Sequence, residues 1–390
     1  MGKSNNKMKI VMLWRLYPGQ ITHYKTKYPF YNNLSFNEHR SLIINEHFVW
    51  QFDLAILMQE KGLDVELFIV NDKALQLKWA KEHSFNSFNF INWEKQIAFD
   101  QVRFHSPNYL YVTSMFDYFG SFFRSAKEFC QKIMVWISAE PPNKLDLGEI
   151  NYLITSQPDV LSEYHNDFEN VIITIPGFSG RINSKIQPIK NNEIVFAGSI
   201  TRYHNNRLKI LSKLAENNIP LSIYSDIKDY SKREHLKAGI GDFIINNSYK
   251  RSLYQLKSVF IKSDYDLNVE KIKPYIKKPV FGLDYYQLIA NAKIIINIHS
   301  DFSGKHADNI RLFEATGMGT LLITDNPSST NKVFKEDKEV VTFTDYDSLI
   351  EKIRNYNNDL CNSIAKNGQR KTLSAYSIDN VYDNLATIFR

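Results

Sequence analysis

The chain has 390 residues, 43% of them hydrophobic and 14% aromatic, which is more than one hydrophobic core usually serves. We therefore expect two folded domains of similar size, and the composition excludes an intrinsically disordered protein. The formal net charge of +6 comes from 48 basic and 42 acidic residues spread along the chain, which argues against a nucleic-acid-binding protein and suits an anionic ligand or an anionic membrane surface.

The two cysteines argue against two further classes of protein. Cys130 and Cys361 lie in different halves and match no metal-ligand spacing, so neither a disulfide framework nor a zinc site is expected.

The N-terminus lacks the pattern of a signal peptide, and no stretch approaches the roughly 20 apolar residues of a membrane-spanning helix. We expect a cytoplasmic protein.

Strands and helices alternate through the first half of the chain. Residues 9–14 predict a buried strand, 48–60 a helix and 65–70 the next strand. Further strands are predicted at 109–113, 133–137, 152–155 and 171–175. Apolar strands alternating with helices are typical of a parallel sheet covered on both faces. The first half is therefore expected to be Rossmann-like.

The second half repeats the pattern after a linker predicted at 176–192. Its predicted strands are 193–197, 221–224, 293–298 and 320–324, and its predicted helices are 207–216, 285–292 and 309–316. We interpret the Lys-rich segment 247–278 as surface helices and loops. The domains are expected at 1–180 and 190–370, and a helix within 371–390 either closes the second domain or crosses back to the first.

The segment 300–319 follows a predicted buried strand, so it lies at the carboxyl edge of the second sheet, where open α/β sheets bind ligands. Ser300 and Gly304 fit a tight polar turn, and the helix after it offers free N–H groups to a phosphate. Lys305 and Arg311 supply neutralising charge.

The same helix carries a carboxylate. Glu314, about one turn beyond Asn309, can accept hydrogen bonds from a ribose diol. Alternatively, Glu314 and Arg311 form only a solvated ion pair on the helix surface.

A second polar cluster, at 196–207, follows the first predicted strand of the second half. Gly198 and Ser199 are small enough for a diphosphate or sugar to approach the backbone, and Arg202 or Arg207 could pair with phosphate oxygens. An ordinary strand-to-helix turn explains the same residues.

Two residues of the first half are candidate general bases. Glu140 follows a predicted central strand and precedes two prolines, so it either deprotonates an acceptor hydroxyl or caps a turn. His105 is a weaker candidate of the same kind.

Residues 283–326, together with 196–207, resemble the C-terminal domain of the group 1 glycosyltransferases, especially the CgeB-like branch. The resemblance rests on Arg311, Glu314, Gly317 and Gly319, which follow a strand ending in Asn297. It implies the GT-B fold, in which two Rossmann-like domains face a central cleft. The C-terminal domain would then bind a nucleotide-sugar donor, and the acceptor would bind in the cleft.

The resemblance also implies roles for individual residues. Glu314 would hold the ribose, while Gly198, Ser199 and Arg202 would lie near the phosphates or the sugar. Many relatives have a second glutamate eight positions earlier, where this chain has His306. His306, Lys305 or Asp308 would take over part of the sugar contact. His306 would otherwise stabilise the leaving group, unless it is simply a surface residue.

The aromatic and basic segment 14–40 is predicted to be a long loop that binds the acceptor, because loops of this length are usually functional and aromatic rings stack on sugars. The turn at Gly19 faces the cleft in GT-B enzymes, so Gly19 and His23 are candidate acceptor contacts, with a structural turn as the alternative.

The expected activity is sugar transfer to a glycan, lipid-linked or protein-linked acceptor in bacterial surface glycan synthesis. We expect neither a metal nor another cofactor, because no Asp-x-Asp signature follows a strand. Group 1 relatives usually retain anomeric configuration, whereas inversion would require Glu140 or His105 as base. Residues 248–278 either touch the inner membrane leaflet or form a solvated face.

Rival functions are a nucleotide-sugar epimerase or hydrolase of the same fold and a non-catalytic nucleotide- or glycan-binding protein. A nicotinamide-dependent oxidoreductase is disfavoured, because no Gly-x-Gly-x-x-Gly follows either first strand.

Overall fold

A computed structural model of the chain describes residues 7–85, 91–113, 118, 120–138, 149–157, 170–201, 204–227, 236, 240, 264–299, 309–325 and 330–389. Within these residues the strands form two six-stranded parallel sheets, ordered β2-β1-β3-β4-β5-β6 and β12-β11-β10-β7-β8-β9. The prediction of two Rossmann-like α/β units is therefore confirmed. We call residues 7–173 together with the last helix the N-lobe, and residues 194–375 the C-lobe.

The first sheet consists of β1 (Lys9–Trp14), β2 (Asp64–Ile69), β3 (Tyr109–Val112), β4 (Lys132–Trp136), β5 (Tyr152–Thr155) and β6 (Asn170–Ile173). Its helices are α1 (Pro18–Lys27), α2 (Phe36–Glu46), α3 (Trp50–Glu60), α4 (Lys73–Glu82), α5 (Trp93–His105) and α6 (Ser121–Ala126). The buried strands coincide with the predicted apolar runs to within two residues at either end.

The second sheet consists of β7 (Ile194–Ala197), β8 (Leu221–Tyr224), β9 (Ile276–Lys277), β10 (Ile294–Asn297), β11 (Leu321–Asp325) and β12 (Val341–Phe343). Its helices are α7 (Asn205–Glu216), α10 (Asp264–Ile272), α11 (Gly282–Asn291), α12 (Ile310–Gly317), α13 (Thr330–Val333), α14 (Tyr346–Asn355) and α15 (Asn358–Ala375), and α16 (Ile378–Ala386) follows. Ile294 and Ile296 belong to one buried cluster and Ile295 to another. This alternation means that helices cover both faces of the sheet.

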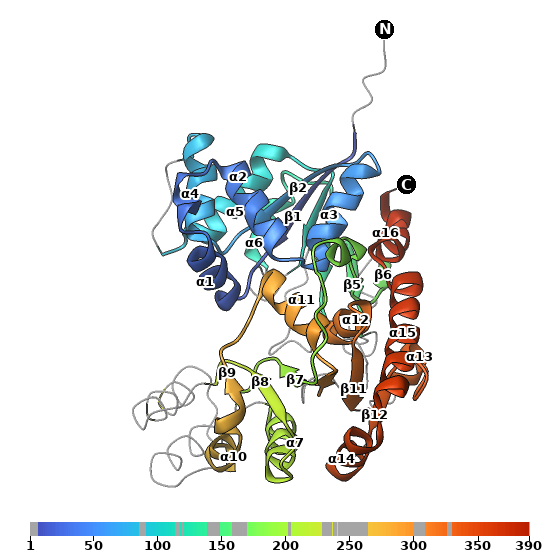
Figure 1. Cartoon of the computed structure of the whole chain (residues 1–390). Helices are drawn as coiled ribbons and strands as arrows, with labels where there is room; N and C mark the ends of the chain where they lie inside the picture. Colours follow the sequence, from blue (N-terminus) through green and yellow to red (C-terminus); the bar gives the residue numbers. More distant parts are fainter. Residues whose placement is uncertain are drawn as a thin grey trace.

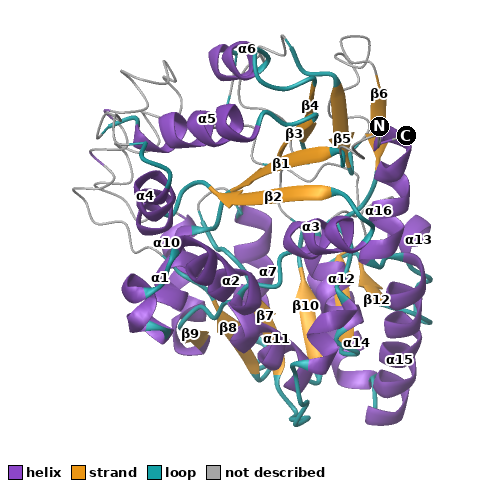
Figure 2. Ribbon diagram, turned by 90° about the horizontal axis from the view of Figure 1, so that it is seen from above, coloured by secondary structure: helices purple, strands orange, loops and turns teal. Residues whose placement is uncertain are grey.

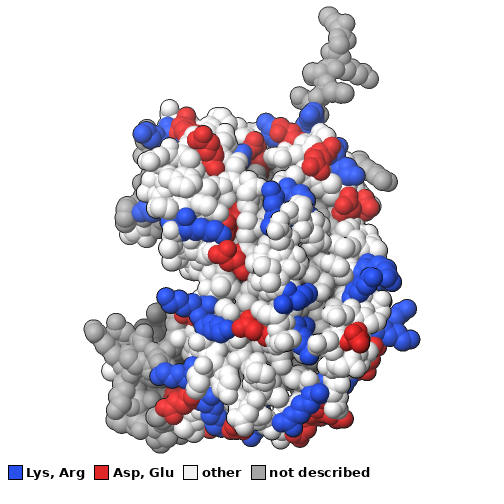
Figure 3. All heavy atoms as spheres, in the orientation of Figure 1, with Lys and Arg blue, Asp and Glu red and all other residues white. Residues whose placement is uncertain are grey.

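The last helix joins the two lobes. α15 packs on α12 and β11 of the C-lobe, whereas α16 packs on α3, where Ile378, Val381 and Leu385 enter the N-lobe core. Figure 1 shows the lobes stacked with α15 and α16 along one side, and the view in Figure 2 places α16 beside α3. Figure 3 shows the surface hollowed between the lobes on the side of α1, with Lys and Arg side chains along both borders.

The prediction of a long loop at 14–40 is wrong, because this segment forms α1, a 3-10 turn at Pro29–Asn33 and α2. Pro18 stands in the first turn of α1, where its fixed φ favours a helix. Ser35 and Glu38 form a capping box that starts α2. These local signals outweigh the aromatic and basic composition on which the loop prediction relied.

Two other segments are more ordered than predicted. The linker 176–192 contains a 3-10 turn at Gly180–Ser184, and its Phe178, Ile182 and Ile186 are buried against the C-lobe. In the segment 247–278, α10 buries Tyr265 and Val269 against α7, while residues 247–263 lie outside the described part. Among the described residues no helix has the length and apolar character that crossing a membrane requires.

Candidate functional site

The carboxyl ends of β10 and β11 form a polar edge of the C-lobe. Asn297, the last residue of β10, donates to Thr324 Oγ1 at 3.0 Å and accepts from Asn309 Nδ2 at 3.0 Å. Asn309 in turn caps α12, because its Oδ1 accepts from the Arg311 N–H at 3.0 Å. The predicted donor contact Asn309 therefore ties the start of α12 to the sheet.

Glu314 lies on α12 and is held by two tyrosines of α11. Its Oε2 accepts from the Tyr285 hydroxyl at 2.7 Å, and its Oε1 lies 3.1 Å from the Tyr286 hydroxyl. Burial raises the pKa of both phenols well above their ordinary value, so they remain hydrogen-bond donors at neutral pH. Because a carboxylate has about four acceptor positions, Glu314 can still accept bonds from a ligand diol.

Arg311 is a largely buried cation with unused hydrogen-bonding capacity. Its guanidinium lies 4.9 Å from the ring centre of Tyr285, and its Nε is 3.4 Å from Glu314 Oε2. Its Nε and Nη1 are nevertheless buried without a hydrogen-bond partner. The Arg311 and Glu314 side chains are only 19% and 13% exposed, so they are not the solvated surface pair considered from the sequence.

His299 and Asp325 form a further pair at this edge that the sequence reasoning missed. His299 Nδ1 is 2.6 Å from Asp325 Oδ1, and the His299 backbone N–H also donates to this carboxylate. The side chain of His299 is 5% exposed, and its Nε2 is buried without a partner. Its place just after β10 was the available signal, but His299 fell between the predicted strand 293–298 and the predicted polar segment 300–319.

Arg207 connects the turn after β7 to the residue that follows β10. Its guanidinium is buried and donates to the backbone oxygens of Ser199 at 2.6 Å and Ile298 at 2.8 Å. Ser199 itself is exposed and Gly198 is half-buried, so this turn offers backbone to the surface beside the edge. Arg202 lies outside the described residues.

The two lobes meet where α1 approaches the start of α11. A Cβ added to Gly19 would lie 2.3 Å from Phe281 Cζ, so glycine permits this approach. His23 Nε2 lies 2.8 Å from Glu46 Oε1, and Lys27 donates to Glu46 at 3.1 Å and to Asp284 at 2.9 Å. Gly19 and His23 thus stand at the lobe junction, where Glu46 occupies one nitrogen of His23.

Tyr17 belongs to the N-lobe wall of the cleft. It precedes α1 and exposes 73% of its surface. Partial desolvation raises the pKa of the Tyr17 phenol, as does the nearby Glu314 carboxylate of the C-lobe, while Arg311 acts in the opposite direction. Tyr17 therefore faces the edge of the C-lobe that carries Arg311 and Glu314.

His105 stands apart from the other candidates. It ends α5, and its ring packs against Phe68 at 5.5 Å and Phe104 at 5.0 Å. Burial lowers its pKa, and the nearby charges include Lys9 and Asp64, which begin β1 and β2. His105 therefore lies at the edge of the sheet opposite the carboxyl ends.

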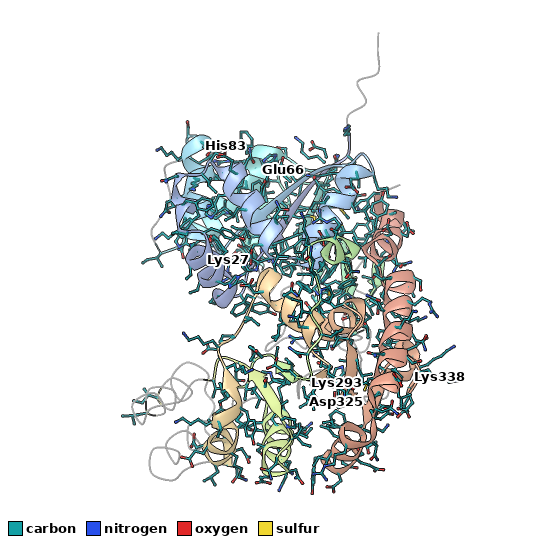
Figure 4. The ribbon with its side chains drawn as sticks, viewed as in Figure 1. Lys27, Glu66, His83, Lys293, Asp325 and Lys338 are labelled. Carbon is teal, nitrogen blue, oxygen red and sulfur yellow. The ribbon has the colours of Figure 1, made fainter. Side chains whose placement is uncertain are left out.

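Several other candidates lie outside the described residues: Glu140, Ser300, Gly304, Lys305, His306 and Asp308. Figure 4 labels Lys27 in the N-lobe on the side of the cleft and Asp325 in the C-lobe, while Glu66 and His83 lie in the part of the N-lobe away from the C-lobe. The described candidates that the structure brings together are Asn309, Arg311 and Glu314.

Comparison with known proteins agrees with this architecture. A family model described as glycosyl transferase-like matches residues 207–387. A glycosyltransferase of Rickettsia africae ESF-5 is similar over 98% of both chains, with 11% identity and a TM-score of 0.55. Sucrose-phosphate synthase of Thermosynechococcus elongatus has 8% identity over 98% of both chains and a TM-score of 0.54.

Anabaena HepE in complex with UDP and glucose has 10% identity, covering 98% of this chain and 99% of its own, with a TM-score of 0.52. No curated protein matches the chain. The chain therefore has the GT-B fold. The family match over residues 207–387 supports a glycosyltransferase.

Proposed function

We propose that the chain transfers a sugar from a nucleotide-sugar donor, bound at the carboxyl edge of the C-lobe, to an acceptor hydroxyl in the cleft. The observation that carries the proposal is the arrangement around Glu314. A carboxylate with free acceptor positions, oriented by two phenols, lies beside the buried cation Arg311, whose Nε and Nη1 have no hydrogen-bond partner. A ribose diol and an anionic diphosphate are the complementary ligand groups.

The electrostatics of this edge favour a departing diphosphate. The N-terminus of α12 carries the positive end of the helix dipole, and Arg311 adds a full charge that is only 19% exposed. Such fixed charges stabilise a leaving phosphate without a metal, so we propose a metal-independent reaction. The similar HepE structures are complexes with UDP and with UDP-glucose, which makes a uridine nucleotide the first donor to test.

Retention of anomeric configuration fits this site, because the donor phosphate can then assist the incoming hydroxyl. Inversion would need a base, and of the two candidates His105 lies at the wrong edge of the N-lobe sheet, which leaves Glu140. Tyr17, Gly19 and His23 lie on the N-lobe side, where the acceptor would approach. Closure of the cleft would exclude water from the reaction.

The finer assignment follows the sequence resemblance: a CgeB-like enzyme of bacterial surface polysaccharide or glycan synthesis, acting in the cytoplasm on a glycan, lipid-linked or protein-linked acceptor. Contact of residues 248–278 with the inner leaflet would suit a lipid-linked acceptor. The mild net charge of +6 gives no reason to include nucleic acid among the partners.

Binding of nucleotides tests the donor site. Thermal unfolding of the wild type is measured with UDP, GDP, CDP, ADP, dTDP and CMP, and repeated with Glu314→Gln. We expect one nucleotide to stabilise the wild type, and the variant to bind it about 10- to 100-fold more weakly, because bonds to a charged acceptor contribute roughly 1.5–3 kcal/mol. Glu351→Gln, on exposed α14 surface, is the matched control. Equal stabilisation of wild type and Glu314→Gln would refute the ribose assignment, and no stabilisation by any nucleotide would refute the donor site.

A further inference from the structure

We propose that His299, held by Asp325, is a contact for the diphosphate of the donor. This inference rests on the proposed function and adds a residue that neither the sequence motif nor the family match assigns. It starts from a buried ring nitrogen that has no partner in the described structure.

Asp325 fixes the orientation of the His299 ring. The carboxylate accepts from the His299 backbone N–H at 3.0 Å and lies 2.6 Å from ring Nδ1. Because a carboxylate can only accept, Nδ1 must carry a hydrogen, and Nε2 is left to face whatever ligand binds. Thr324 adds a hydroxyl 3.3 Å from the same carboxylate oxygen, so Asp325 is itself held in place.

The polar atoms around this pair are satisfied by one another. Asn309 bonds to Asn297, Asn297 bonds to Thr324, and the carbonyl of Ile298 accepts from Arg207. Among the described residues at this edge, the buried nitrogens without a partner are Nε2 of His299 and Nε and Nη1 of Arg311. Buried polar atoms are nearly always paired, so these exceptions need a missing partner.

A phosphate oxygen is the partner that satisfies both residues. Arg311 can only donate hydrogen bonds, and His299 donates from Nε2 when its ring is protonated, with Asp325 balancing the charge. A hydrogen bond between an imidazolium and a phosphate is charge-assisted, and it is strong where solvent is absent, as it is at a side chain 5% exposed. His299 follows the end of β10 and Arg311 lies in the first turn of α12, so both belong to the carboxyl edge of the sheet. This placement suits contacts with two oxygens of one diphosphate.

The test compares a nucleoside diphosphate with its nucleoside. Isothermal titration measures UDP and uridine, or the pair with the base that the thermal panel selects, on wild type and His299→Asn. Asparagine keeps an amide near Asp325 and removes only the outer nitrogen. We expect UDP to bind about 10- to 100-fold more weakly and uridine to bind within about twofold of wild type. Glu314→Gln should instead weaken both ligands.

Two further variants separate binding from folding. His299→Gln places an amide near the position of Nε2 and should restore part of the UDP affinity. His83→Asn, directly after α4 in the part of the N-lobe away from the C-lobe, should leave both affinities unchanged. An unchanged UDP affinity in His299→Asn, or equal losses of UDP and uridine, would overturn the contact with the diphosphate while leaving the donor site intact. Failure of wild type to bind any nucleoside diphosphate would overturn the proposed function, and this inference with it.

Discussion

Glu46 gives the most quantitative test of the polar cluster on the N-lobe side of the lobe junction. Its side chain is 1% exposed and lies 2.8 Å from His23 Nε2, 3.1 Å from Lys27 Nζ and 2.7 Å from the Tyr28 hydroxyl. Burial opposes ionisation of Glu46, but these three partners outweigh it and lower its pKa from 4.5 to about 2. A change of this size corresponds to about 3 kcal/mol of native-state stability.

Glu46→Gln should therefore lower the free energy of unfolding at neutral pH by up to about 3 kcal/mol. The folded pKa is below the unfolded one, so the stabilisation is complete above pH 4.5 and is lost as the pH falls from 4.5 to about 2. The variant should lack this part of the acid dependence. Urea unfolding followed by tryptophan fluorescence across this pH range measures both effects.

Asp284→Asn is the matched control, because Asp284 pairs with the same Lys27 at 2.9 Å but is 53% exposed. An exposed ion pair contributes less than about 1 kcal/mol, so this variant should keep the acid dependence of the wild type. If Glu46→Gln were as stable as the wild type, with the same pH profile, the junction would not depend on this carboxylate.

Two further substitutions test the backbone around the site. Gly282 has φ +59°, and an added Cβ would lie 2.6 Å from the Glu46 carbonyl oxygen, so Gly282→Ala should lower the free energy of unfolding by about 1–3 kcal/mol, measured in urea. Gly180→Ala is the control, because no atom lies within 4 Å of a Cβ added there, and it should change the free energy of unfolding little. Equal stability of the two variants would contradict the strain at Gly282. Arg207→Met should lower the melting temperature, because it removes the donor to the carbonyls of Ser199 and Ile298, and an unsatisfied buried acceptor costs about 1–3 kcal/mol. The same variant should not change UDP affinity. A weakened UDP affinity with unchanged stability would show instead that Arg207 contacts phosphate.

The parallel strands could be predicted because their hydrophobic runs are nearly continuous. β1 and β5 begin and end where the sequence predicts, since both faces of each sheet are covered and few polar residues interrupt the pattern. The helices of segment 14–40 were also encoded locally, by Pro18 and by the pair Ser35 and Glu38, but the aromatic composition was given more weight.

The surroundings of the site could not be read from local sequence. Glu314 was placed on a helix by its motif, yet the tyrosines that hold it come from α11, and Tyr17 comes from the other lobe. The approach of Gly19 to Phe281 likewise joins segments distant in the chain. Such contacts depend on how the lobes pack, which no periodicity of a single segment records.

The donor site at the carboxyl edge of the C-lobe is the central claim, and a crystal structure of the chain with bound UDP tests it most directly. We predict that the ribose hydroxyls lie within hydrogen-bond distance of the Glu314 carboxylate and that the phosphates lie against the start of α12, beside Arg311. UDP bound in the N-lobe, or bound in the C-lobe with Glu314 contacting only Tyr285 and Tyr286, would contradict the account.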